Sequence, residues 1–291
     1  MINDAAFNQT QNFRSNYIRT TKYTALSFLP LSLLYQFMRF SNIYFLFVAI
    51  LQSIPIVSPL HPMTAIFPLI FVLVVSMIRE GYEDYGRYQS DKAQNSQVVK
   101  VLRKGDKDFR EITSAELVVG DLILCSEGET FPADIALLTS SLEGGECFIK
   151  TSSLDGEKNL KKRVQCKDFE LLFPFNQLAV TKYAGIKGKV DLELPNKDLH
   201  SFKGMITING NDYTLSDKQI LLKGANLENT TWALGLVCYT GEDSKIMLNS
   251  QQGRQKMSHM EVKVNQLVLY IIASQALFCV AMSVGSYIWQ E

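Results

Sequence analysis

The chain has 291 residues, of which 29 are basic and 29 acidic, so that its formal net charge is zero. This balance gives no electrostatic argument for a nucleic-acid partner, and none is expected. The five cysteines contain no Cys-x-x-Cys pair and only three histidines are present, which argues against a metal site or a disulfide framework and favours reduced thiols facing a cytosol.

The first segment, residues 1–40, is expected to be a cytosolic N-terminus that ends in an interfacial helix. Residues 1–20 are polar, lack the basic-then-apolar pattern of a cleaved signal peptide, and are expected to be poorly ordered. Residues 21–40 are apolar and aromatic but are interrupted by Pro30. The interruption favours a helix lying in the membrane interface over the alternative, the first part of a long transmembrane helix.

A charge-free stretch then predicts a pair of transmembrane helices within residues 41–95. No Asp, Glu, Lys or Arg occurs between Arg39 and Arg79. A helix needs about 20 apolar residues to cross a bilayer, and this stretch is about twice as long, with several prolines near its middle. Two helices are expected, at residues 41–60 and 63–78, and the second is expected to continue beyond the membrane.

The basic residues set the expected orientation of this pair. Lys and Arg occur on both sides of the charge-free stretch, whereas the turn near His61 carries neither. By the positive-inside rule, both ends of the pair are expected in the cytosol, with the turn on the opposite side.

From residue 96 to residue 257 the pattern changes to short apolar runs, such as QVVKVLR, LILC and MITI, separated by turns that contain glycine. This is typical of a β-rich soluble domain, and about 160 residues are enough to bury a core. Residues 258–291 follow as a linker and a third, charge-free transmembrane helix. The predicted fold class is therefore an α+β membrane protein: a helical hairpin, a cytosolic β-rich domain and a third transmembrane helix.

The segment of chemical interest is residues 151–161, TSSLDGEKNLK. Asp155 and Glu157 stand on either side of Gly156, and Asp-Gly is typical of a tight turn. A strand-like run precedes this turn and a basic run follows it, so that a glutamate is expected at the tip of a turn with cations close by. For an isolated Asp-Gly-Glu, the simpler interpretation is a solvated hairpin turn.

The strings around this segment carry a resemblance to a known family. They include NIYFLFVAILQSIPIVSP, EGYEDYGRYQSDKAQN, VGDLILCSEGETFPADIALLTSS, TSSLDGEKNLK and LLKGANLENTTWALGLVCYTGEDSKIMLNS, in that order along the chain. From about Arg14 onward, the chain resembles the N-terminal part of type IV P-type ATPases, the phospholipid flippases. The resemblance implies that the β-rich domain is the actuator domain.

The resemblance also implies roles for the turn. In this family, the matching loop moves to an aspartyl-phosphate on another domain. Glu157 is then expected to position and help deprotonate the water that hydrolyses the acyl phosphate, Gly156 to let the backbone approach, and Asp155 to shape the turn. Lys158 stands where most members have Thr, and a neutral variation is favoured over a contact with the phosphate. The similar string EGET at residues 127–130 is expected to be an ordinary turn.

Three polar residues of the first predicted span are candidates for substrate binding. The resemblance implies a lipid path beside the first two spans and the fourth, and polar groups inside a bilayer often mark such a path. Gln52 and Ser53 are the main candidates, and Asn42 is a weaker one. For Gln52, a hydrogen bond to a neighbouring helix is an equal alternative.

The strings that would bind and receive phosphate are not in the chain. It carries neither Asp-Lys-Thr-Gly-Thr nor a Walker loop. Alone it is expected to be inactive and to bind no cofactor, whereas the full-length protein is expected to use ATP and Mg²⁺ to move phospholipid from the exoplasmic to the cytosolic leaflet. The resemblance implies a two-span glycosylated accessory β-subunit as partner and a plasma, Golgi or endosomal membrane as location.

Two alternatives remain open from the sequence. The first alternative is a truncated, non-catalytic membrane protein that binds a flippase or its accessory subunit. A further possibility is an ion-transporting P-type ATPase, although those usually carry Thr-Gly-Glu-Ser at the position of residues 154–157.

Overall fold

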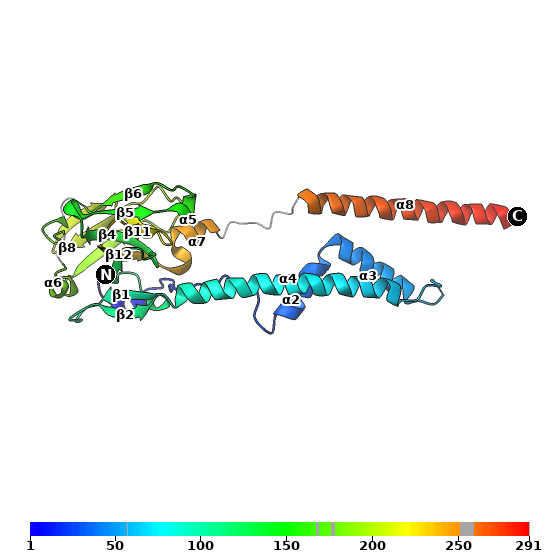
Figure 1. Cartoon of the computed structure of the whole chain (residues 1–291), viewed down its shortest axis with the longest axis horizontal. Helices are drawn as coiled ribbons and strands as arrows, with labels where there is room; N and C mark the ends of the chain where they lie inside the picture. Colours follow the sequence, from blue (N-terminus) through cyan, green and yellow to red (C-terminus); the bar gives the residue numbers. More distant parts are fainter. Residues whose placement is uncertain (57, 167–168, 176–177, 251–258, 291) are drawn as a thin grey trace. The chain divides into compact units, whose positions relative to one another are not determined.

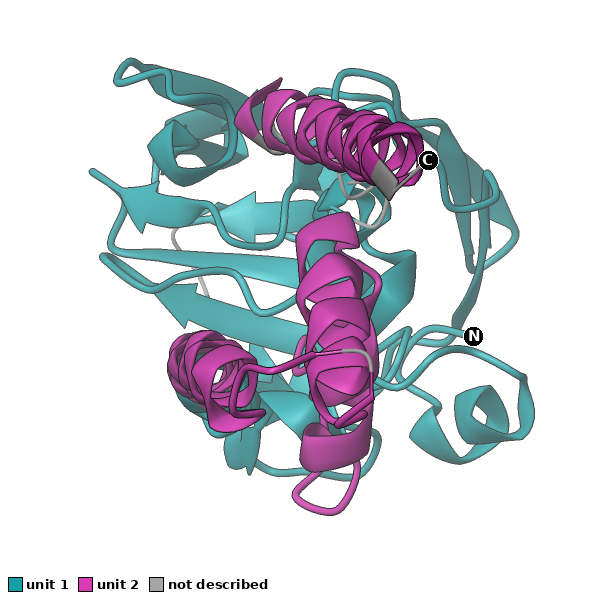
Figure 2. Cartoon of the chain, turned by 90° about the vertical axis from the view of Figure 1, so that its right-hand side faces the viewer, with its two compact units in different colours: residues 1–19, 89–252 teal, residues 20–88, 253–291 magenta. Residues whose placement is uncertain are grey.

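The computed structural model describes residues 1–56, 58–166, 169–175, 178–250 and 259–290 (Figure 1). The chain divides into two compact units (Figure 2). Unit 1 comprises Met1–Arg19 and Gln89–Gln252, and unit 2 comprises Thr20–Tyr88 and Gly253–Glu291. Unit 1 is rich in strands and unit 2 is helical, so that the predicted α+β fold class is confirmed.

The main sheet of unit 1 has six strands in the order β10-β4-β12-β3-β1-β2, and every neighbouring pair is antiparallel. The strands are β1 (Val98–Leu102), β2 (Arg110–Thr113), β3 (Leu122–Ser126), β4 (Asp134–Ser140), β10 (Ile220–Leu221) and β12 (Trp232–Tyr239).

Two smaller antiparallel sheets complete unit 1, with strand orders β11-β5-β6 and β7-β8-β9. Their strands are β5 (Glu146–Lys150), β6 (Leu160–Val164), β7 (Gly188–Leu192), β8 (Gly204–Ile208), β9 (Asn211–Leu215) and β11 (Asn226–Glu228). The short helices of the unit are α1 (Ala5–Thr10), α5 (Ser152–Asp155), α6 (Val180–Ala184) and α7 (Lys245–Ser250), with 3-10 turns at Ser114–Glu116, Glu143–Gly145 and Gly241–Asp243.

Strand β4 shows how the main sheet builds the core. All seven of its residues are buried. Successive side chains of a strand point to opposite faces, and accordingly Ile135 and Leu137 join one apolar cluster whereas Ala136 and Leu138 join another. Because both faces of the sheet are covered, this strand has a continuous apolar run instead of an alternating one.

Gly235, in the middle of β12, marks a close approach between strands. A Cβ atom added there would lie 2.2 Å from the Ile135 Cγ2 atom and 3.1 Å from the Ala136 carbonyl oxygen. We expect Gly235→Ala to lower the free energy of unfolding of unit 1 by about 1–3 kcal/mol, because the core has no room for the methyl group. The measurement is urea unfolding followed by Trp232 fluorescence, in a Trp289→Phe background that removes the second tryptophan.

Gly185→Ala is the matched control for this substitution. A Cβ atom at Gly185 would meet only ordinary contacts, at 3.7 Å from the carbonyl oxygens of Thr181 and Lys182. Equal stability losses in the two variants would contradict the close packing at Gly235.

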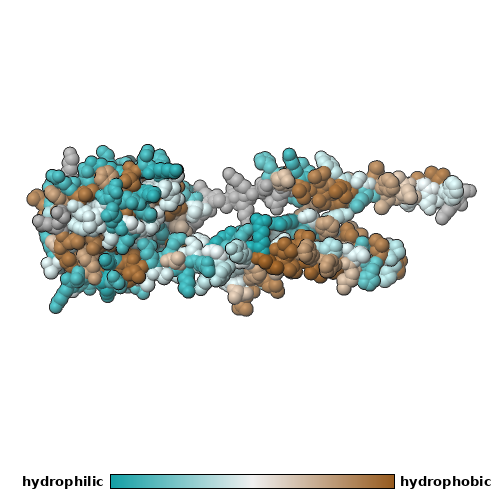
Figure 3. Space-filling model, in the orientation of Figure 1, coloured by the Kyte–Doolittle hydropathy of each residue, from teal (hydrophilic) through white to brown (hydrophobic). Residues whose placement is uncertain are grey.

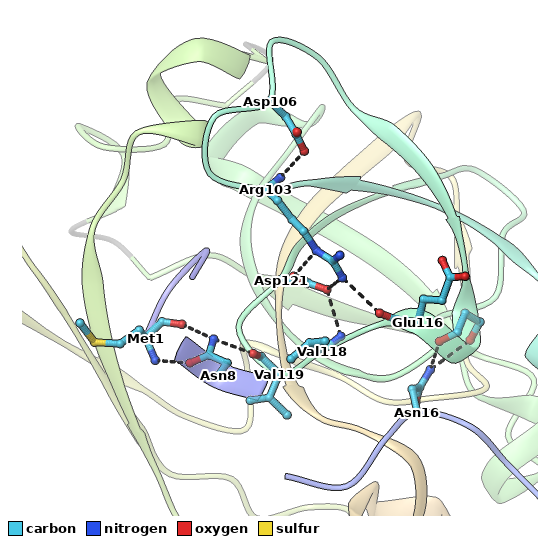
Figure 4. A network of polar contacts seen from close by, with 10 residues as sticks. Met1, Asn8, Asn16, Arg103, Asp106, Glu116, Val118, Val119 and Asp121 are labelled. Carbon is cyan, nitrogen blue, oxygen red and sulfur yellow. Dashed lines mark hydrogen bonds and ion pairs between the residues drawn. The ribbon is translucent and has the colours of Figure 1, made fainter. Parts of the chain in front are cut away.

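The sequence predicts a poorly ordered N-terminal segment. In the structure, however, its asparagines bond to distant backbone groups of unit 1. The Asn16 amide nitrogen donates to the carbonyl oxygens of Ser114, at 2.8 Å, and Pro132, at 3.1 Å, while its Oδ1 accepts from the Gly241 amide at 2.9 Å. Asn8 donates in the same way to the Val119 carbonyl at 2.8 Å (Figure 4).

Asp121 and Asp134 are buried aspartates with structural roles. Asp121 accepts from the Val118 amide and forms an ion pair with Arg103, with 2.7 Å between Nη2 and Oδ2 (Figure 4). Asp134 is fully buried and accepts from the backbone amides of Lys223, at 2.8 Å, and Lys245, at 2.7 Å. These two carboxylates therefore join segments that are far apart in the sequence.

Unit 2 contains the apolar helices, whose exposed surfaces are largely hydrophobic (Figure 3). Helices α4 (Met63–Asn95) and α8 (His259–Gln290) are each long and apolar enough to cross a membrane. As predicted, α4 continues without a break beyond the charge-free segment, to Asn95.

The first predicted span is shorter than the sequence indicates. Helix α3 (Phe40–Gln52) has 13 residues, or about 20 Å, whereas a bilayer core is about 30 Å thick. It is preceded by α2 (Phe28–Phe37), and the two helices meet at an angle of 91°, so that the pair is a bent span or a re-entrant segment. The helix predicted over residues 41–60 therefore ends earlier in the structure, at Gln52.

From the sequence, Pro30 is expected to interrupt the apolar segment, but Pro30 is the third residue of α2 and lies within the helix. A proline is tolerated in the first turn because the amide there has no partner within the helix. The Ser32 hydroxyl of α2 donates to the Glu80 carboxylate of α4 at 2.6 Å, which attaches α2 to α4, and the Tyr23 hydroxyl, from the segment before α2, donates to the same carboxylate at 2.5 Å.

Candidate active-site loop

The candidate loop connects β5 and β6, which pair from Glu146 opposite Val164 to Lys150 opposite Leu160. Residues 151–159 form the connection between the two strands. It contains one helical turn, α5, which ends at Gly156 with φ 76° and ψ −1°. The sequence therefore predicts the turn and its glycine, but not the helical residues that precede them.

Two residues at the start of the loop hold it against the rest of unit 1, and a third bonds within the loop. The Ser153 hydroxyl donates to the Gly224 carbonyl at 2.8 Å, and Leu154 packs against both apolar clusters. Thr151 is buried, and its hydroxyl donates to Asp155 Oδ2 at 2.9 Å. Sequence reasoning assigned no role to these three residues, because their partners lie in other segments or within the folded loop.

Asp155 closes the turn through several donors. Its Oδ1 accepts from the Glu157 backbone amide at 2.9 Å, and its carboxylate also accepts from Thr151 and from the Lys161 ammonium. The hydrogen bond from Lys161 is the main cause that lowers the pKa of Asp155 to about 2, and the bonds from Glu157 and Thr151 add to it. Asp155 is therefore charged throughout the physiological range.

Glu157 lies at the tip of the loop. Its side chain is 61% exposed, and its Oε2 atom is 3.0 Å from the Lys161 Nζ atom. Lys158 follows it and is also exposed. The arrangement therefore presents a solvent-accessible carboxylate on a loop whose base is fixed, which can orient a water molecule and accept its proton.

The string EGET at residues 127–130 is a turn, as predicted. The Glu129 carboxylate accepts from the Ser126 amide at 2.7 Å, Gly128 has φ 81°, and Thr130 forms an isolated bridge with Asn226. The glutamate at position 129 is thus used within its own turn, unlike Glu157.

The three candidate substrate-binding residues lie on α3 and at its end, and the structure does not bring all of them together. Gln52 Oε1 accepts from the Thr64 hydroxyl at 3.0 Å, which joins the end of α3 to α4, and the Ser53 hydroxyl donates to the Ala49 carbonyl at 2.8 Å. Asn42 is buried and donates to the Gln36 carbonyl at 2.8 Å. It lies ten residues before Gln52, or about 15 Å along a helix.

The donor groups of the chain give no metal centre in the described residues. There, no three or more His, Cys, Asp or Glu side chains are grouped so that they could hold a metal ion. The charged groups at the loop include two carboxylates and the ammonium groups of Lys158 and Lys161.

Two family models match the chain. Residues 1–66 match the family described as the phospholipid-translocating ATPase N-terminal region, and residues 93–246, more than half of the chain, match the P-type ATPase actuator domain.

Curated relatives match over nearly all of the chain. The chain is 39% identical to phospholipid-transporting ATPase 6 of Arabidopsis thaliana over 261 residues, which is 90% of the chain and 20% of the relative. It is 38% identical to phospholipid-transporting ATPase VA of Homo sapiens over 281 residues (96% and 18%) and 34% identical to phospholipid-transporting ATPase DRS2 of Saccharomyces cerevisiae over 290 residues (99% and 21%). The chain thus spans about a fifth of the length of these relatives.

Proposed function

Because the chain belongs to the P-type ATPases, with the N-terminal region and actuator domain of their phospholipid-translocating members, we propose that it is the N-terminal part of an ATP-driven phospholipid pump. The observation that carries this proposal is the loop around Glu157: its base is fixed by Ser153 and Leu154, and its tip presents an exposed carboxylate. A solvated hairpin turn would not need such supports.

The proposed reaction is hydrolysis of an aspartyl-phosphate carried by another part of the pump. Glu157 orients a water molecule and takes one of its protons while the water oxygen attacks phosphorus. The bond between phosphorus and the aspartyl oxygen breaks, which gives inorganic phosphate and a free aspartate carboxylate. Gly156, without a side chain, lets the backbone approach the phosphoryl group, and Asp155 keeps the turn in shape.

We further propose that the pump moves lipid from the exoplasmic to the cytosolic leaflet, with unit 1 in the cytosol. Gln52 and Ser53 lie together at the end of α3 and are proposed to contact the lipid head group. Asn42 would act separately, since it is used at the junction of α2 and α3. Lys158 is proposed to be a neutral variation, which its exposed position supports.

The rest of the pump would supply what this chain does not contain. ATP and Mg²⁺ would be bound by other domains of the full-length protein, and the phosphorylated aspartate would lie there too. A two-span glycosylated accessory β-subunit is the proposed partner, and a plasma, Golgi or endosomal membrane is the proposed location.

The test of this proposal is reconstitution of the full-length protein into vesicles. We expect ATP hydrolysis to be stimulated by a phospholipid, and a fluorescent analogue of that lipid to move in an ATP-dependent way toward the leaflet that bears unit 1. ATPase activity that responds to Na⁺, K⁺ or Ca²⁺ but to no phospholipid would contradict it.

A further inference from the structure

Lys161 is the cation that both carboxylates of the loop share. It is the second residue of β6, where the strand ladder places it opposite Ile149 of β5. Its ammonium forms ion pairs with Asp155 and with Glu157, the latter at 3.0 Å. Only 24% of its side chain is exposed, so that the ammonium is held over the loop instead of extending into solvent.

The turn itself does not depend on this contact with Glu157. Asp155 accepts from the Glu157 amide and from the Thr151 hydroxyl, and Gly156 has the left-handed conformation that ends α5. The Lys161 ion pair instead acts on the Glu157 side chain, which is the part that meets the water.

The two ion pairs of Lys161 differ in strength. Asp155 is 25% exposed and Glu157 is 61% exposed, and solvent weakens the second pair more than the first. Asp155 therefore anchors the ammonium, and the anchored ammonium confines the Glu157 carboxylate. A glutamate side chain at a loop tip would otherwise sample many rotamers, and confinement reduces the entropy lost when it engages a water molecule.

We propose that Lys161, tethered by Asp155, is a positioning residue that holds the Glu157 carboxylate in place for phosphoenzyme hydrolysis. The inference rests on the proposed function of the loop, to which it adds a residue. The carboxylate stays exposed while it is confined, so that it remains able to reach a phosphoryl group on another domain.

The test is the decay of phosphoenzyme in the full-length protein. Lys161→Met keeps the length of the side chain and removes its charge, and we expect it to slow dephosphorylation about 10- to 100-fold, as for a misplaced catalytic group. Formation of the phosphoenzyme from ATP should keep its rate. Lys161→Arg, which keeps the charge, should recover most of the lost rate.

Lys162→Met is the matched control. Lys162 is the next residue of β6 and pairs with Glu146 at 2.6 Å, so that this variant also removes an ion pair of the same strand. We expect normal dephosphorylation from it. Equal slowing by the two variants, or failure of Lys161→Arg to recover any rate, would assign Lys161 a merely structural role and overturn the inference.

A double variant separates this inference from the proposed function. If Lys161 acts through Glu157, adding Lys161→Met to Glu157→Gln should slow dephosphorylation no further. A further 10-fold loss would overturn the inference. If Glu157→Gln itself has no effect, both the inference and the function proposed for the loop fail; if Glu157→Gln slows decay and Lys161→Met does not, only the inference fails.

Discussion

In the full-length protein, if it is the pump proposed above, Glu157→Gln will leave phosphorylation by ATP intact and slow phosphoenzyme hydrolysis by at least about 100-fold, which is the usual contribution of a general base. Glutamine has the same shape and still accepts a hydrogen bond from water, but it does not take up a proton at neutral pH. The phosphoenzyme should therefore accumulate and lipid transport should stop. The measurement is the decay of radiolabelled phosphoenzyme after a chase with unlabelled ATP.

Glu129→Gln provides the control for this experiment. Glu129 lies in the similar string EGET, where its carboxylate accepts from the Ser126 amide within a turn. Its replacement should leave phosphoenzyme decay unchanged. Normal decay in Glu157→Gln would show that the loop has another role.

The second large effect is on stability: Asp134→Ala should lower the free energy of unfolding of unit 1 by about 3–5 kcal/mol, because it leaves two buried backbone amides without their acceptor. Asp134 is 0% exposed, and its carboxylate accepts hydrogen bonds from the backbone amides of the buried lysines Lys223 and Lys245. Burial raises the pKa of Asp134 to about 6 and lowers that of Lys223 to about 8. Alanine would leave two buried amides unpaired and two buried cations without their shared neighbour.

Urea unfolding followed by Trp232 fluorescence measures this loss, again with Trp289 replaced. Asp212→Ala is the control, because Asp212 is exposed and accepts from the Thr207 hydroxyl of the neighbouring strand on the surface. Its effect should stay within about 0.5 kcal/mol. If the two alanine variants were equally stable, Asp134 would not be the junction that its contacts indicate.

Patterns local in the sequence were enough for the main elements. The charge-free run and the apolar residues after it predict the long helix α4, and the alternation of apolar runs and glycine turns predicts the β-rich unit. The glycine between two acidic residues likewise predicts a turn at position 156 with an exposed glutamate beside it.

Contacts between distant segments were beyond the reach of such patterns. A polar N-terminus is typical of a disordered segment, yet the side-chain amide of Asn16 donates hydrogen bonds to backbone carbonyls about 100 residues away or more. At the break between α2 and α3, Asn42 donates to a carbonyl at the end of α2, and no local pattern predicts this contact. Lys161 reaches Asp155 across six residues, a spacing that becomes a contact only when the two strands pair.

The backbone conformation of Gly156 restricts which residues can replace it. A Cβ atom there would meet no atom of this chain within 4 Å, so that packing within the chain does not restrict the position; the positive φ of 76° does. The constraint is therefore one of handedness: a D-alanine would fit without strain where an L-alanine would not, and among the genetically encoded side chains asparagine and aspartate come nearest to glycine in accepting this geometry.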